Sequence, residues 1–115
     1  MKTVELNISE RVFALGYLDN FKGTVSLLAK VLEDVKKFGV QQEDWEKADR
    51  KIIKTGDSES WTWNDEKGGL KSIEADEDTL TFLKVEIVKK ERAEGFGLKD
   101  KAVISLLEKL ETVLK

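Results

Sequence analysis

The chain contains no histidine, no cysteine and no proline among its 115 residues. Without histidine it lacks the only side chain that titrates near neutral pH when unperturbed. Without cysteine it lacks a thiolate nucleophile and a soft metal ligand. Without proline, helices must be interrupted by other residues, chiefly the 8 glycines. Because the residue types most used in catalysis are missing, we expect a non-enzymatic protein that needs no cofactor and no metal.

Strong charge of one sign is also missing. The 20 basic and 23 acidic side chains leave a net charge of −3, and the two signs are interspersed along the chain rather than collected in blocks. This pattern provides no basic stripe for a nucleic-acid backbone. No apolar run approaches the roughly 20 residues that span a membrane, and the N-terminus has no apolar secretory segment. We therefore expect a cytoplasmic protein that binds neither nucleic acid nor membranes directly.

Length and hydrophobic periodicity predict one compact domain over residues 1–115, because a chain of this size can bury one core but not two. Apolar residues that recur every three or four positions, together with capping residues, predict helices. Ser9, Thr24 and Asp76 are the expected N-terminal caps of three of them. The expected helices cover residues 10–18, 25–38, 42–49, 77–94 and 99–114.

Period-two alternation predicts four strands, at residues 3–8, 51–55, 59–64 and 70–75. Short turns join the last three, so we expect them to form an antiparallel three-stranded meander, with Leu70 and Ile73 facing inward. The predicted fold class is α+β. Four or five helices would pack on one face of a small, mainly antiparallel sheet that consists of the N-terminal strand and the meander.

Trp61 and Trp63 are the most distinctive pair, because alternate positions of a strand face the same way. They could stack on a ligand or on a partner's ring, but large aromatic residues at this spacing more often cover a helix from the inner face of a sheet. Trp45 is the expected anchor of the short acidic helix. The residues that flank the pair are acidic, which argues against a nucleic-acid platform: Asp57, Glu59, Asp65 and Glu66.

Two charged clusters have ordinary structural interpretations. Lys84, Lys89, Lys90 and Arg92 form the only local basic concentration, but glutamates are interleaved with them, as on a solvated helix surface. The carboxylates of Glu74, Asp76, Glu77 and Asp78 could hold a hard cation, although the start of a helix explains them more simply. The candidate interaction surface comprises Trp61, Trp63, Trp45, Lys89 and Arg92.

The order of elements resembles that of small phage and prophage proteins of unassigned function. The likeness is carried by the segment Val4–Arg11, Gly23 before a leucine-rich helix, Trp45, the segment Ser60–Asn64, and the break at Gly95–Leu98. It spans most of the chain, but Asp19-Asn20 stands where the pattern has a proline-containing turn. The resemblance implies a protein that acts by contact in the cytoplasm of an infected or lysogenic bacterium, and it implies no catalytic or binding residue.

The expected function is therefore that of a small acidic interaction module, encoded by a phage or prophage, that binds another protein. Two alternatives stay open. One is an inhibitor of a bacterial defence system, which would bind a nuclease or sequester a signalling nucleotide. The other is an enzyme that uses a carboxylate or a lysine in place of histidine. We also expect that the helix at 77–94, apolar on more than one side, could pack against a second copy as a homodimer.

Overall fold

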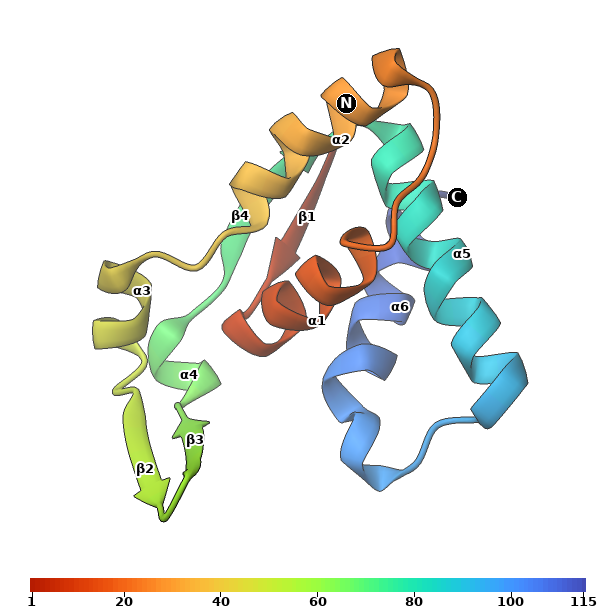
Figure 1. Ribbon diagram of the computed structural model, residues 1–115. Helices are drawn as coiled ribbons and strands as arrows, with labels where there is room; N and C mark the ends of the chain where they lie inside the picture. Colours follow the sequence, from red (N-terminus) through yellow and green to blue (C-terminus); the bar gives the residue numbers. More distant parts are fainter.

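The computed structural model describes residues 1–115, the whole chain. It is an α+β fold, as predicted from the sequence, and Figure 1 shows its elements coloured along the chain. The elements occur in the order β1 (Lys2–Leu6), α1 (Ile8–Leu18), α2 (Val25–Phe38), α3 (Gln42–Lys47), β2 (Lys51–Thr55), β3 (Ser58–Thr62), α4 (Asp65–Gly68), β4 (Lys71–Ala75), α5 (Glu77–Glu94), the 3₁₀ turn η1 (Leu98–Asp100) and α6 (Lys101–Val113).

The strands form two separate antiparallel sheets, β1 with β4 and β2 with β3. The predicted three-stranded meander is therefore wrong. The single-turn helix α4 separates β3 from β4, and Asn64 caps it by accepting a hydrogen bond from the Lys67 backbone N–H at 3.1 Å. β4 instead pairs with β1, where Ile73 lies opposite Val4 and both side chains face the core. This pairing buries alternate residues of both strands, which pairing with the exposed β3 would not do.

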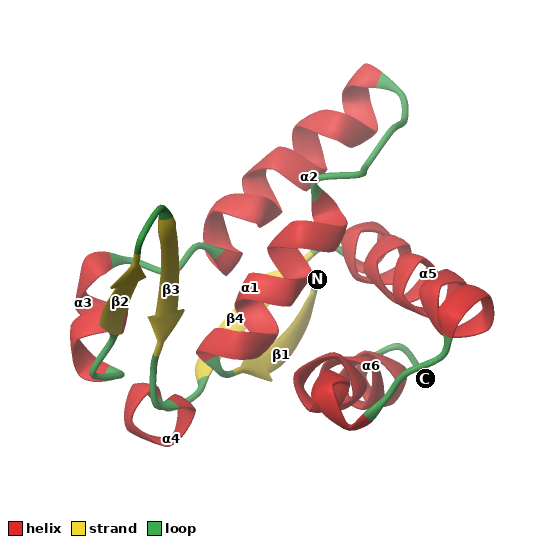
Figure 2. Ribbon diagram, turned by 60° about the horizontal axis from the view of Figure 1, so that its bottom comes forward, coloured by secondary structure: helices red, strands yellow, loops and turns green.

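The main core lies between the β1–β4 sheet and the long helices. α1 contacts α2, α5 and α6, while α2 packs near β4 and α6 near β1. Figure 2 shows α1 crossing the centre of this arrangement. Leu70, expected to face inward, is instead 60% exposed, whereas Ile73 is buried as predicted. The core residues are Val4, Leu6, Ala14, Leu18, Val31, Phe38, Ile73, Ala75, Leu80, Leu83, Ile87, Val103, Leu106, Leu107 and Leu110.

The β2–β3 hairpin extends from the body, on the side opposite α5 and α6 (Figures 1 and 2). Every residue of both strands is exposed, so the hairpin contributes nothing to the main core. Its position depends on contacts at its base with α1, α3 and α4.

The first helix begins earlier than predicted. Its N-terminal cap is Asn7 rather than Ser9, because the Asn7 side chain accepts from the Glu10 N–H at 2.8 Å while Glu10 Oε1 accepts from the Asn7 N–H at 2.9 Å. This reciprocal pair is a capping box. The predicted caps of the second and fifth helices are confirmed: Thr24 accepts from Leu27 N–H and Asp76 from Asp78 N–H.

The apolar residues of α5 are mostly covered by neighbouring elements. Leu80, Leu83 and Ile87 are buried, and Phe82 and Val88 pack against the core, as expected of a helix contacted on two sides. Val85, which is 45% exposed, is the one large apolar residue of α5 that is exposed to solvent. The helix therefore leaves a much smaller apolar face than the sequence indicated. None of the helices combines the length and the apolar character that crossing a membrane requires.

Candidate interaction surface

The three tryptophans come together at the base of the hairpin. Trp45, on α3, makes edge-to-face contacts with Trp61, at 5.7 Å between ring centroids, and with Trp63, at 5.1 Å. Such contacts between aromatic rings are stabilising beyond the area they bury. The indoles of Trp61, on β3, and Trp63, directly after β3, thus pack against α3, but not from the inner face of a core sheet, because every residue of β3 is exposed. The cluster lies outside the main core.

Arg50 completes this cluster, and the sequence analysis did not single it out. Its guanidinium lies 4.6 Å from the centroid of Trp61 and 5.5 Å from that of Trp45, which are cation–π distances. The β2–β3 register places Ile52 opposite Trp61, and Arg50, two residues before Ile52, is on the same face. The alternation of side chains along β2, once β2 is paired with β3, is the sequence signal that places Arg50 on the face of Trp61.

The indoles of Trp63 and Trp61 form hydrogen bonds with different parts of the molecule. Trp63 Nε1 donates to Ser9 Oγ at 3.1 Å and to Asp65 Oδ1 at 3.0 Å, which ties the end of the hairpin to α1. Trp61 Nε1 donates to Glu59 Oε1 at 2.7 Å, within its own strand. Trp63 is therefore an anchor of the hairpin, whereas Trp61 is attached only to the hairpin and α3.

The outer part of the cluster is accessible to a partner. The side chain of Trp61 is 45% exposed, and its cross-strand neighbour Ile52 is 46% exposed. A shallow hollow of about 270 Å³ lies beside Trp61 and Trp63, and Ser9 and Asp65 contribute to its lining. Trp45, Arg50, Ile52, Trp61 and Trp63 are called the indole surface below.

Ser9 and Asp65 have a structural function in this hollow. The Ser9 hydroxyl donates to Asp65 Oδ2 at 2.7 Å and accepts from the indole N–H of Trp63. The Ser9 backbone N–H, near the positive end of α1, donates to Asp65 Oδ1 at 3.0 Å. The hydrogen bonds of the Ser9 hydroxyl thus attach the end of the hairpin to α1.

Arg11 anchors the other side of the hairpin base. It is 2% exposed, and its guanidinium donates to the carbonyl groups of Phe38 and Gly39 and to Asp44 Oδ2. The pKa of Asp44 is lowered, first by the hydrogen bond from the Gln41 N–H and then by Arg11; burial acts in the opposite direction. A buried guanidinium with three acceptors fixes the position of α3 relative to α1.

Lys89 and Arg92 do not join the indole surface. Both are exposed on α5, which lies on the opposite side of the molecule from the hairpin (Figure 2). Lys89 Nζ is 3.2 Å from Glu86 Oε1, in an i,i+3 pair on the same helix. The candidate set of five residues therefore divides into three tryptophans that meet and two basic residues that lie elsewhere.

The acidic cluster at the start of α5 takes part in helix capping. Asp76 caps the helix, and Lys30 Nζ lies 3.8 Å from Asp76 and 3.9 Å from Asp78. No group of three or more metal-ligating side chains comes together in the structure.

Comparisons with known proteins place the chain in no family. No protein-family model, no curated protein sequence and no solved structure matches it.

Proposed function

We propose that the protein is a small interaction module that contacts another protein through the indole surface. The observation that carries this proposal is the packing of Arg50 on partly exposed indoles at the face of a projecting hairpin. Tryptophan and arginine are the residue types most enriched among residues that dominate protein–protein binding energies. Aromatic rings that only stabilise a fold are usually covered by other residues, whereas Trp61 is 45% exposed to solvent.

The rigidity of the hairpin base supports this role. Trp63, Ser9 and Asp65 connect the hairpin to α1 by hydrogen bonds of 3.1 Å or less. The Asn64 N–H also donates to the Ala48 carbonyl at 2.8 Å. Surfaces that are ordered before binding lose less conformational entropy when a partner docks. The hairpin thus presents Trp61 in a defined orientation despite lacking a buried core.

Charge indicates the chemistry of the partner. Arg50, Lys51 and Lys54 lie on or beside β2, and none of them takes part in an ion pair within the chain. The partner that fits this surface has an apolar depression for Trp61 and carboxylates at its margin. Single-stranded nucleic acid also stacks on indoles, but it needs a continuous basic surface. Residues 50–59 carry three cations (Arg50, Lys51, Lys54) and two carboxylates (Asp57, Glu59), a net charge of only +1.

The resemblance to small phage and prophage proteins supplies the proposed setting. We place the protein in the cytoplasm of a bacterium that carries the phage, with a bacterial or phage protein as its partner. No feature of the indole surface favours a nuclease inhibitor or a nucleotide sponge over other forms of protein binding.

The test compares three tagged variants as baits in bacterial lysate, followed by affinity measurement with the purified captured protein. Trp61→Ala removes the exposed indole, and Arg50→Gln removes the free cation. Leu98→Ala is the control, because Leu98 is 89% exposed and lies on η1, away from the hairpin. Truncating a residue that dominates binding costs about 2 kcal/mol or more, about thirtyfold in Kd.

The expected result is a partner that binds the wild type and Leu98→Ala equally, and Trp61→Ala at least tenfold more weakly. Circular dichroism of each variant shows whether the fold is retained. Equal binding by all variants, or tighter binding of a single-stranded oligonucleotide than of any protein, would refute the proposal.

A further inference from the structure

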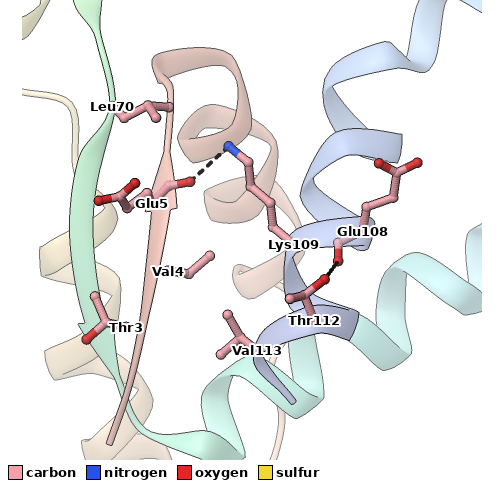
Figure 3. Close-up of a pocket in the computed structure, with 8 residues that line it drawn as sticks. All are labelled: Thr3, Val4, Glu5, Leu70, Glu108, Lys109, Thr112 and Val113. Atoms are coloured by element: carbon pink, nitrogen blue, oxygen red, sulfur yellow. Dashed lines mark hydrogen bonds between the residues drawn. The ribbon is translucent and has the colours of Figure 1, made fainter. Parts of the chain in front are cut away.

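A second surface, independent of the indole surface, lies where β1 faces α6. It is an open groove of about 440 Å³, within the volume range of ligand sites, and Figure 3 shows the residues that line it. One side of the groove consists of β1 and the other of the last turns of α6. The lining residues are Thr3, Val4, Glu5, Leu70, Glu108, Lys109, Thr112 and Val113.

The groove runs along an unpaired strand edge. The β1–β4 sheet has only two strands, so each strand has one edge without a ladder partner. Lys109 Nζ donates to the Glu5 carbonyl at 2.9 Å, and Figure 3 shows it reaching that oxygen from α6. On the other strand, Lys37 Nζ donates to the Glu74 carbonyl at 2.8 Å. Both lysines approach from helices that flank the sheet, so these two carbonyl groups point away from the ladder.

The register of β1 and β4 shows which backbone N–H and C=O groups point away from the ladder. In an antiparallel ladder, the N–H and C=O of one residue point to the same side, and alternate residues point the same way. Thr3 lies opposite Glu74, and Glu5 lies opposite Ser72. Thr3 and Glu5 therefore direct their backbone groups into the groove, while Ser72 and Glu74 direct theirs to the far edge, which packs beside α2. An open groove lies along the β1 edge.

Lys109 occupies the Glu5 carbonyl, which an added strand would use. Lys109 Nζ also binds Glu10 Oε1 at 2.7 Å. An incoming backbone N–H can therefore take over the Glu5 carbonyl while Lys109 keeps its buried partner.

Charge and polarity select the side chains of the added strand. Glu5 and Glu108 border the groove, and neither forms an ion pair within the chain. The apolar part of the lining consists of Val4, Leu70 and Val113. A strand that alternates basic and apolar residues would place its two kinds of side chain on opposite faces.

We propose that the β1 edge binds an extended segment of a partner protein in which basic and apolar residues alternate. The segment adds a third strand to the β1–β4 sheet, with backbone hydrogen bonds to Thr3 and Glu5 and ion pairs to Glu5 and Glu108. This mode of recognition, strand addition, takes affinity from main-chain bonds and specificity from alternate side chains.

The probe is an acetylated and amidated peptide of sequence Lys-Val-Lys-Val-Lys-Val, titrated into the full chain and followed by amide chemical shifts in NMR. The largest shifts are expected at the amides of Thr3 and Glu5. Thr3→Pro removes a donor that points into the groove without removing a β1–β4 hydrogen bond. Ser72→Pro is the matched control, because it makes the same backbone change at the far edge; it also removes the hydrogen bond from Ser72 Oγ to Glu5 Oε1 at 3.3 Å, which leaves the Glu5 carboxylate available to the peptide. We expect at least tenfold weaker binding by Thr3→Pro and less than twofold change by Ser72→Pro.

A second pair of variants keeps the proposal testable if a proline variant does not fold. Glu108→Lys reverses a charge that lines the groove, and Glu111→Lys makes the same change on the same helix at an exposed residue outside the lining. We expect Glu108→Lys to weaken binding at least threefold more than Glu111→Lys does. Equal effects of the paired variants, or shifts centred away from β1, would overturn the assignment. Shifts at Thr3 and Glu5 that follow protein concentration without peptide would also overturn it, because a second copy would then occupy the edge.

Discussion

Asp65 accepts two hydrogen bonds from Ser9, which lies 56 residues earlier in the chain: Oδ1 accepts from the backbone N–H at 3.0 Å and Oδ2 from the hydroxyl at 2.7 Å. Asp65 Oδ1 also accepts from the indole N–H of Trp63. One carboxylate thus joins the first turn of α1, the end of the hairpin and the start of α4. The orientation of the indole surface depends on this junction.

Replacement of Asp65 by alanine is expected to reduce the free energy of unfolding by about 1–3 kcal/mol, because part-buried donors on Ser9 and Trp63 lose their acceptor. Urea denaturation followed by tryptophan fluorescence measures the loss. The control is Asp57→Ala in the hairpin turn, which is exposed and should change stability by less than about 0.5 kcal/mol. Similar losses in both variants would contradict the proposed junction.

The pair Glu10–Lys109 is expected to show strong coupling. Glu10 is fully buried, and its carboxylate accepts from Lys109 Nζ at 2.7 Å and from Ser105 Oγ at 2.8 Å. Lys109→Met leaves the buried carboxylate without its cation and should cost about 3–5 kcal/mol. The double variant Glu10→Gln/Lys109→Met should cost less than the sum of the single variants. Thermal or urea unfolding gives the coupling energy, and additive costs would show that the pair does not interact.

Lys101→Met is the control for this cycle. Lys101 is exposed on the same helix and forms no ion pair, so the same chemical change there should alter stability by less than about 0.5 kcal/mol.

Stability should depend on pH through Asp44. Hydrogen bonding to Gln41 and Arg11 lowers the pKa of Asp44 in the folded protein below its value in the unfolded chain. The unfolded state therefore binds more protons between the two values, so stability rises with pH there. The contribution is complete above the ordinary aspartate pKa of about 3.9 and is lost as the pH falls toward the lower folded value. Asp44→Asn should flatten the wild-type curve of unfolding free energy against pH in this acidic range; an unchanged slope would contradict the assignment.

Two glycine substitutions are expected to have opposite signs. A Cβ atom at Gly68 would lie 2.8 Å from Ile8 Cδ1 and 3.2 Å from Ala48 Cβ, so Gly68→Ala should destabilise by about 1–3 kcal/mol. A Cβ at Gly16, within α1, would meet nothing within 4 Å, so Gly16→Ala should stabilise by about 0.5–1 kcal/mol. Thermal melts of both variants check this, and a stable Gly68→Ala would show that the seam between α1 and α4 tolerates expansion.

Local chemistry in the sequence determined most of the elements. The 3.6-residue apolar pattern of α2, the caps Thr24 and Asp76, and the alternation of Val4 and Leu6 each depend on neighbours a few residues away. The α+β class and the hairpin follow from the same signals. The three tryptophans were recognised as the distinctive side chains, because their size and spacing can be read along the chain.

Only the tertiary structure decided which elements meet. β4 pairs with β1 rather than β3, since that partner buries Ile73 over the core, and no local pattern specifies a partner about 70 positions away. Arg50 joins the indoles, and Asp65 reaches Ser9, through the same kind of long-range contact. The absence of histidine, cysteine and proline limited the available chemistry, but the surfaces that we propose for binding were created by packing, which depends on the whole chain.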